Sequence, residues 1–334
     1  MKNPLTKIIV VAIAILGQTA MHAQEIYPGK AAPIEDNFPI EFPYESKYFE
    51  FGQEKVHYVE SGEGETVLLL HGIPSSSYVW RNVIDKIDDD KHVIAIDWIG
   101  YGKSSFPEDR NVPAEVQLQM LTEFIEANNL ENATIWMHDL GSIIGMLYAT
   151  RNPENVKAIA LFEAPFMPTA QFYKQLPFSM KAVMKITRKE NKAEKLYVNK
   201  NFVGKIFPNF LTARKLTKEE KKIYGAPFED EERRYIMLTG PDPAQMSFDK
   251  GRGTTSFENI IAEISTGMAN LDKPILYFYA KKGVLNQKEA VEYARATFKN
   301  YQEVFVGKGK HFLTESHPQL MSEEFNTWFN QLTE

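Results

Sequence analysis

The stretch Ala133-Thr-Ile-Trp-Met-His-Asp-Leu-Gly-Ser-Ile-Ile-Gly-Met-Leu-Tyr148 decides the fold of this chain. Its first half is an apolar run that ends at His138 and is short enough for a buried strand. Its second half carries apolar residues at helical spacing, so a helix follows the strand at once. Asp139 lies at the join, where so sharp a turn leaves a residue strained and exposed above the sheet. The pattern predicts a nucleophile elbow built on Asp139.

Two simpler interpretations of the same stretch exist. An Asp that caps a helix after a strand is common in proteins. Ser142 is a second possible nucleophile, but its glycines fall at the wrong offsets for a G-x-S-x-G motif. The residues at the ends of the other predicted strands therefore decide whether Asp139 has chemical partners.

Apolar strands and amphipathic helices alternate on both sides of this stretch. The apolar, β-rich runs fall at 66–70, 92–96, 156–162 and 274–280. Their spacing predicts a mostly parallel, doubly wound sheet with helices on both faces. The alternation stops at Pro165, and the following residues show helical patterns and many lysines without a buried strand. We therefore expect an inserted helical cap.

The N-terminus has the pattern of a secretory signal. Basic residues precede an apolar run at 8–16, and small or polar residues follow it as far as Ala23. The run is too short for a comfortable membrane span, so we expect an exported, periplasmic or secreted protein without stable membrane insertion. An uncleaved N-terminal anchor is the alternative. The predicted segments are a signal peptide (1–23), an extended arm (24–46), the first part of the core (47–165), the cap (166–263) and the second part of the core (264–334).

Composition excludes several classes of function. The 334 residues are 43% apolar, which supports a full core. The net charge is −6 and there is no long basic block, so we expect no nucleic-acid partner. The chain has no cysteine, which excludes disulfides, thiolate nucleophiles and cysteine metal sites.

Two further side chains at strand ends complete a catalytic set with Asp139. Ligands bind beyond the carboxyl ends of the strands in a parallel sheet. His311 follows the last predicted strand and is the best candidate for a base. Glu163 ends the strand after the elbow, whereas the loop 280–286 holds no carboxylate, so Glu163 is the available acid. A nucleophile, a base and an acid at one sheet edge are the requirements for covalent hydrolysis.

An Asp nucleophile narrows the reaction, because a carboxylate needs no deprotonation at neutral pH. It displaces a leaving group from a saturated carbon and forms an alkyl ester, which water activated by His311 then hydrolyses. The backbone N–H groups of Ile73 and Leu140 are the expected donors to the oxyanion. The expected partners are a small hydrophobic organic substrate, such as an alkyl halide or an epoxide, and water. No metal or organic cofactor is implied.

These motifs resemble the haloalkane dehalogenases of the α/β-hydrolase superfamily, in the group of the rhodococcal-type enzymes and the related coelenterazine luciferase. The resemblance runs from about Tyr48 to the C-terminus. It implies an α/β-hydrolase fold, with a mostly parallel eight-stranded sheet, helices on both faces and an inserted helical cap. It places the nucleophile on Asp139, the acid on Glu163 and the base on His311. The matching pieces are 71–82, 97–104, 138–142, 151–156, 283–285 and 311–315.

The chain departs from this family at two leaving-group positions. The family has a Trp directly after the nucleophile and an Asn directly after His-Gly, and their N–H groups hold the departing halide. This chain has Leu140 and Ile73 there, and neither side chain can donate a hydrogen bond. We therefore expect weak release of halide from simple haloalkanes. Trp98, at a strand end, and Tyr224, at a cap position that matches the family, are candidates for further pocket residues.

Three other functions are compatible with the same motifs. An epoxide hydrolase needs a cap tyrosine to protonate the opening ring. A cofactor-free oxygenase like the luciferase is the second, and a catalytically silent binding protein is the third. The complete set of nucleophile, acid and base argues against the silent protein. The sequence does not say which cap tyrosine points at Asp139; the candidates are Tyr173, Tyr197, Tyr224 and Tyr235.

Overall fold

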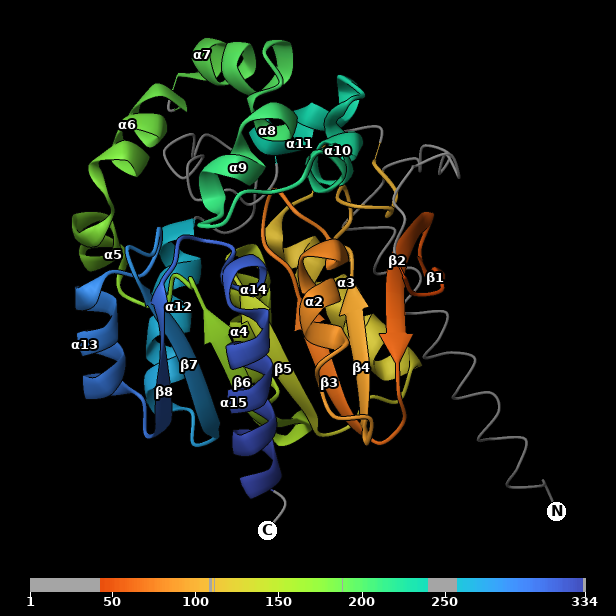
Figure 1. Ribbon diagram of the computed structural model, residues 1–334, viewed down its shortest axis with the longest axis vertical. Helices are drawn as coiled ribbons and strands as arrows, with labels where there is room; N and C mark the ends of the chain where they lie inside the picture. The colour runs from red at the N-terminus through yellow and green to blue at the C-terminus, as the bar shows by residue number, and fades with distance from the viewer. Residues whose placement is uncertain (1–42, 108–109, 111, 188, 240–256, 333–334) are drawn as a thin grey trace, which may run out of the picture.

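The computed structural model shows an α/β core beneath a layer of short helices (Figure 1). Residues 1–42, which hold the predicted signal peptide and most of the predicted arm, lie outside the described residues. No helix of the described part is long and apolar enough to cross a membrane. The structure describes residues 43–107, 110, 112–187, 189–239 and 257–332.

An eight-stranded sheet forms the centre of the core, in the order β1-β2-β4-β3-β5-β6-β7-β8. The two hairpin strands at one edge, β1 and β2, are antiparallel to their neighbours, and all strands from β4 to β8 are parallel. The mostly parallel sheet that the sequence predicts is thus confirmed. The strands are β1 (Lys47–Phe51), β2 (Glu54–Ser61), β3 (Glu65–Leu70), β4 (Lys91–Ile96), β5 (Ala133–His138), β6 (Val156–Phe162), β7 (Pro274–Lys281) and β8 (Asn300–Lys308).

Helices cover both faces of this sheet. In the view of Figure 1, α2, α14 and α15 lie in front of the strands. On the other face, α3 and α12 both pack against α4. The core helices and turns are η1 (Ser77–Trp80), α2 (Arg81–Ile84), α3 (Ala114–Ala127), α4 (Leu140–Arg151), η2 (Pro153–Asn155), α12 (Phe257–Asn270), α13 (Lys288–Thr297), α14 (Leu313–Ser316) and α15 (Pro318–Gln331).

Close packing holds β5 in the middle of the sheet. All six of its residues are buried. Trp136 stacks on Phe325 of α15 with ring centroids 4.4 Å apart. On the opposite face, a Cβ added to Gly145 of α4 would lie 2.6 Å from the Met137 sulfur. Any larger residue at position 145 would require the side chains of Met137 and Leu70 to shift, so the glycine lets α4 pack closely on the strand.

The cap lies over the carboxyl edge of the sheet (Figure 1). The predicted boundary at 263 falls inside α12, which packs on α4 of the core. A Cβ added to Gly267 of α12 would lie 2.6 Å from the Thr150 methyl carbon, so the backbone of α12 packs directly on the Thr150 side chain of α4. The cap elements are α5 (Thr169–Gln175), α6 (Phe178–Thr187), α7 (Glu190–Glu194), η3 (Lys195–Asn199), α8 (Phe202–Lys205), α9 (Phe207–Leu211), α10 (Lys218–Gly225), η4 (Ala226–Phe228), η5 (Glu232–Tyr235) and α11 (Ile236–Thr239).

Candidate active site

Asp139 occupies the sharp turn between β5 and α4. Its φ of 52° and ψ of −123° form a strained conformation for a residue other than glycine. Glycines on both sides make the turn possible. A Cβ on Gly141 would lie 2.3 Å from the Leu70 carbonyl oxygen, and one on Gly72 would lie 2.3 Å from the Asp139 Cβ. The turn therefore presents Asp139 directly to the loop that follows β3.

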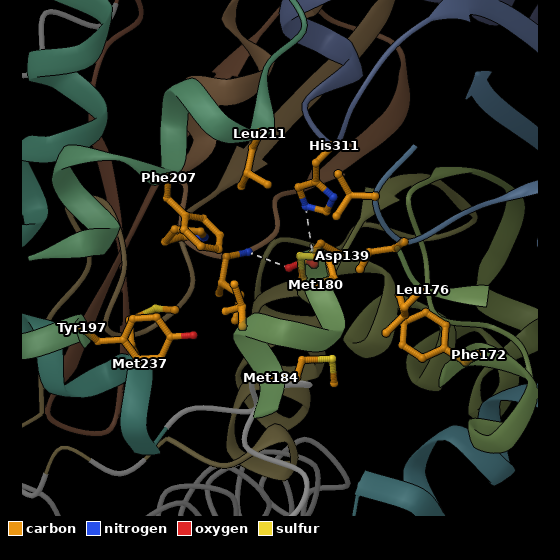
Figure 2. Close-up of a pocket in the computed structure, with 15 residues that line it drawn as sticks. Asp139, Phe172, Leu176, Met180, Met184, Tyr197, Phe207, Leu211, Met237 and His311 are labelled. Atoms are coloured by element: carbon orange, nitrogen blue, oxygen red, sulfur yellow. Dashed lines mark hydrogen bonds and ion pairs between the residues drawn. The ribbon is translucent and has the colours of Figure 1, made fainter. Parts of the chain in front are cut away.

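His311 lies between two carboxylates. Its Nε2 is 3.5 Å from Asp139 Oδ2, and its Nδ1 is 3.1 Å from Glu163 Oε2. Figure 2 shows the imidazole ring facing the Asp139 carboxylate. The three side chains follow β5, β6 and β8 in turn, and all three are buried. The structure thus brings together the three residues that the sequence predicts as nucleophile, acid and base.

The two carboxylates control the charge of His311. Burial opposes its protonation, but the hydrogen bond with Glu163 and the negative charges of Asp139 and Glu163 outweigh burial. The pKa of His311 is therefore raised above its ordinary value of 6.5. A base in this position can hold the proton that it takes from water, because Glu163 stabilises the imidazolium.

Glu163 is itself held by the loop that follows β7. Its Oε2 accepts hydrogen bonds from the N–H groups of Val284 at 2.8 Å and Leu285 at 2.7 Å. Its Oε1 accepts one from the N–H of Asn286 at 3.3 Å. A Cβ on Gly283 would lie 2.3 Å from Oε1, so the loop needs a glycine there. This loop has no carboxylate of its own and instead supplies the donors that fix the acid from the preceding strand.

The two predicted oxyanion positions, Ile73 and Leu140, differ in the structure. The Ile73 N–H donates to Asp139 Oδ1 at 2.8 Å, and the Ile73 side chain lines the pocket above it. The Leu140 side chain is fully buried and is not among the residues that line this pocket. Leu140 begins α4, and the first N–H groups of a helix have no partner within the helix. Of these two side chains, therefore, only that of Ile73 can contact a molecule bound in the pocket.

An apolar pocket with a volume of about 60 Å³ lies above Asp139, between the core loops and the cap (Figure 2). Among the described residues that line it, only Asp139, Tyr197 and His311 have nitrogen or oxygen in their side chains. A lining of this kind suits a small apolar molecule that meets few polar groups. The apolar wall consists of Ile73, Pro74, Phe172, Leu176, Met180, Val183, Met184, Phe207, Leu211, Met237, Val284 and Leu285.

Two predicted pocket residues lie elsewhere, so those predictions are corrected. Trp98 is fully buried, and its indole N–H donates to the His71 carbonyl at 2.7 Å. Tyr224 donates its hydroxyl to Glu315 and stacks on Phe312 with ring centroids 5.7 Å apart. Both polar groups already have protein partners, and both side chains support the packing around the site.

The sequence interpretation missed what the cap contributes to the pocket. Met180, Val183 and Met184 of α6 line it at helical spacing, as do Phe207 and Leu211 of α9. Their spacing is visible in the sequence, but the same pattern marks the buried face of any packed helix. It gave no sign that these faces meet Asp139. Within the described ranges, no cluster of His, Asp or Glu side chains has the arrangement of a metal site.

Comparisons with known proteins place this geometry in a class. Residues 65–318 match the alpha/beta hydrolase fold family, so the protein is an α/β-fold hydrolase. The crystal structure of haloalkane dehalogenase DatA from Agrobacterium tumefaciens C58 is similar, with a TM-score of 0.75 and 23% identity over 86% of this chain and 97% of that one. Haloalkane dehalogenase DbeA from Bradyrhizobium elkani USDA94 has a TM-score of 0.79 and 24% identity over 86% and 98%. These two structures share the fold.

Sequence relatives make the assignment narrower. The haloalkane dehalogenase of Sphingobium indicum is 30% identical over 283 residues, which cover 82% of this chain and 91% of that protein. The haloalkane dehalogenase of Agrobacterium fabrum is 27% identical over 281 residues, or 83% and 89% of the two chains. The protein belongs to the haloalkane dehalogenase family of the α/β-hydrolase superfamily.

Proposed function

We propose that this protein hydrolyses a small apolar substrate through a covalent alkyl ester on Asp139. This proposal rests on one observation: the buried His311 side chain lies between the Asp139 and Glu163 carboxylates, and Asp139 and His311 line an apolar pocket. The substrate carries its leaving group on a saturated carbon, and water is the second reactant.

In the first half-reaction, Asp139 attacks the substrate. The Ile73 N–H holds Oδ1 at 2.8 Å, which leaves Oδ2 as the attacking oxygen. A bond forms between Oδ2 and the substrate carbon, and the leaving group departs with the electron pair of the bond that breaks. The negative charge of the carboxylate is lost in the ester.

In the second half-reaction, water attacks the Asp139 carboxyl carbon and gives a proton to His311. The negative charge then gathers on Oδ1, where the Ile73 N–H and the N-terminus of α4 stabilise it. The tetrahedral intermediate collapses, and the product alcohol takes the proton from His311. The carboxylic acid left at Asp139 then releases one proton, which restores the carboxylate. Glu163 positions His311 and stabilises its charged form throughout this step.

Oxygen-18 labelling tests this route directly. We would mix the enzyme, in excess, with 1-iodobutane in water enriched in oxygen-18 and follow a single turnover. The ester route predicts unlabelled 1-butanol, because the product oxygen comes from Asp139, and label in the Asp139 carboxylate. Labelled 1-butanol in the first turnover would show direct attack by water and contradict the proposal. Many turnovers provide the control, because labelled alcohol must then appear.

We also propose that the chain is exported to the periplasm or the medium after loss of residues 1–23. The basic start and the apolar run at 8–16 support this proposal. Expression of the full chain in a Gram-negative host, followed by fractionation and intact-mass measurement, tests it. A shortened protein outside the cytoplasm is the expected result. A full-length protein in the cytoplasm or the inner membrane would contradict it.

A further inference from the structure

The leaving group needs a hydrogen-bond donor that the predicted site does not contain. Negative charge grows on the departing atom inside an apolar pocket, where it is poorly solvated. Neither Ile73 nor Leu140 has a donor in its side chain, and the Ile73 N–H already donates to Asp139. His311 faces Asp139 and serves as the base. The donor must come from another residue of the pocket wall.

Tyr197 is the remaining polar side chain in the described pocket lining. It is 2% exposed and belongs to the cap, whereas Asp139 belongs to the core. Figure 2 shows its hydroxyl directed from the cap into the interior of the pocket, on the side of Asp139. The phenol and the nucleophile thus lie on different walls of one cavity, which leaves room for a substrate between them.

The backbone at Tyr197 is unusual as well. Residues Lys195–Asn199 form a π-helical turn, with Tyr197 at its centre. Such turns are rare, occur often at functional sites, and alter the direction in which side chains leave the helix. The turn gives a local reason why the cap aims this tyrosine at the pocket.

We propose that the Tyr197 hydroxyl donates a hydrogen bond to the leaving atom while Asp139 attacks. This inference rests on the proposed function and assigns the leaving-group step of that reaction. A departing halide needs only the hydrogen bond and leaves as the anion. An epoxide needs the proton as well: Asp139 bonds to a ring carbon, the carbon–oxygen bond breaks, and the ring oxygen takes the proton of Tyr197. Hydrolysis of the ester then frees one proton, which restores the phenol.

The role predicts a dependence on leaving group that packing alone would not cause. Chloride and an epoxide oxygen hold concentrated charge and need the donor most, whereas iodide needs it least. Tyr197→Phe should slow alkylation by 1-chlorobutane and 1,2-epoxyhexane by about 100-fold, the usual effect of removing a preorganised donor. Alkylation by 1-iodobutane should fall by less than about tenfold. Chloride release and diol formation in the native protein then show which leaving atom it handles.

The measurement uses His311→Ala and the double variant His311→Ala/Tyr197→Phe, in which the ester accumulates and intact mass follows its formation. Tyr235→Phe in the same background is the matched control, because Tyr235 is a cap tyrosine outside this pocket lining. It should change all three rates by less than about twofold. Circular dichroism checks that each variant is folded.

Each outcome discriminates. Equal losses with all three substrates would make Tyr197 structural and overturn the inference, as would no loss at all. The inference would also be overturned if 1-iodobutane were the only one of the three substrates to alkylate the His311→Ala protein. The Tyr197 hydroxyl would then not stabilise departing chloride or an epoxide oxygen. Absence of any ester on Asp139, with Tyr197 present, would instead overturn the proposed function itself.

Discussion

Glu163 controls the charge of His311 from a strained position. Its φ is 47°, a left-handed conformation that residues other than glycine rarely adopt. Three N–H groups of the loop after β7 hold its carboxylate against the strain. Asn286 ties the same loop to the residue after Glu163. Its side-chain oxygen accepts a hydrogen bond from the Ala164 N–H, and its side-chain NH2 donates one to the Ala164 carbonyl, both at 2.8 Å. Sequence reasoning found Glu163 as the available carboxylate but missed Asn286, since an asparagine in a loop has no distinctive pattern.

The raised pKa of His311 leads to a pH prediction. Water activation needs the neutral imidazole, so ester hydrolysis is lost as pH falls through this pKa, which lies above 6.5 in the free enzyme. Esterification removes the charge of Asp139, so in the intermediate only Glu163 still raises the pKa. Glu163→Gln should therefore move the acid limb of ester hydrolysis to lower pH. By analogy with other triad acids, it should also slow the step by about 100-fold or more.

Stopped-flow measurement of ester hydrolysis between pH 5 and 9 checks this prediction, and circular dichroism controls for folding. A folded Glu163→Gln protein with the native rate and the native acid limb would show that the acid lies elsewhere.

Ile73 lines the pocket but has no hydrogen-bond donor in its side chain, so a donor can be added at this position as a test. Ile73→Asn places an amide N–H at a pocket-lining position beside Asp139. A hydrogen bond to a charged group contributes about 1.5–3 kcal/mol, so bromide release from 1-bromobutane should rise by about tenfold or more. Leu140→Trp should not help, because Leu140 is fully buried and overpacking a core costs about 1–3 kcal/mol.

Bromide release by native protein and by the two variants measures this difference. Ile73→Asn should be the fastest of the three, because it adds a second side-chain donor to the one proposed at Tyr197. Release by Ile73→Asn that is no faster than native release would show that a donor at position 73 does not reach the leaving group.

At the scale of elements, a buried ionic cluster fastens helix α10 of the cap to the core. Arg81 donates to both Glu315 oxygens, at 2.6 and 3.1 Å, and to Glu220 of α10 at 2.9 Å. Arg214 also pairs with both acids, and its hydrogen bonds are the main reason that the pKa of Glu220 falls to about 2. The Glu315 side chain is fully buried. Arg81 and Glu315 both belong to the core, but the full set of ion pairs exists only while α10 stays on the core.

Arg81→Met should destabilise the protein strongly, because it leaves part of the buried charge of Glu315 uncompensated. Breaking a buried ion pair lowers the free energy of unfolding by about 3–5 kcal/mol. Arg151→Met is the matched control, since the Arg151–Glu263 pair joins two core helices with side chains that are 48% and 42% exposed. Its loss should cost less than about 1 kcal/mol. Urea unfolding gives both values, and similar small losses would show that the cluster does not stabilise the cap.

At the scale of the whole molecule, the core could be predicted from the sequence and the contents of the pocket could not. Apolar runs that end in Asp139, Glu163 and His311 indicate one sheet edge, because the carboxyl ends of parallel strands share it. No comparable rule relates the cap to that edge. Trp98 also follows a strand, yet its indole N–H donates a hydrogen bond to the His71 carbonyl and not to the pocket. Of the four cap tyrosines, the sequence favours Tyr224 as a pocket residue, whereas tertiary packing brings Tyr197 to the pocket.

If Asp139 carries the substrate as an ester that His311 removes, His311→Ala should still be alkylated by 1-iodobutane but should not release 1-butanol. Intact-mass spectrometry should show one added butyl group per chain, and peptide mapping should place it on Asp139. An adduct on another residue would contradict the ester route through Asp139. So would the absence of an adduct under conditions in which the native protein turns the substrate over.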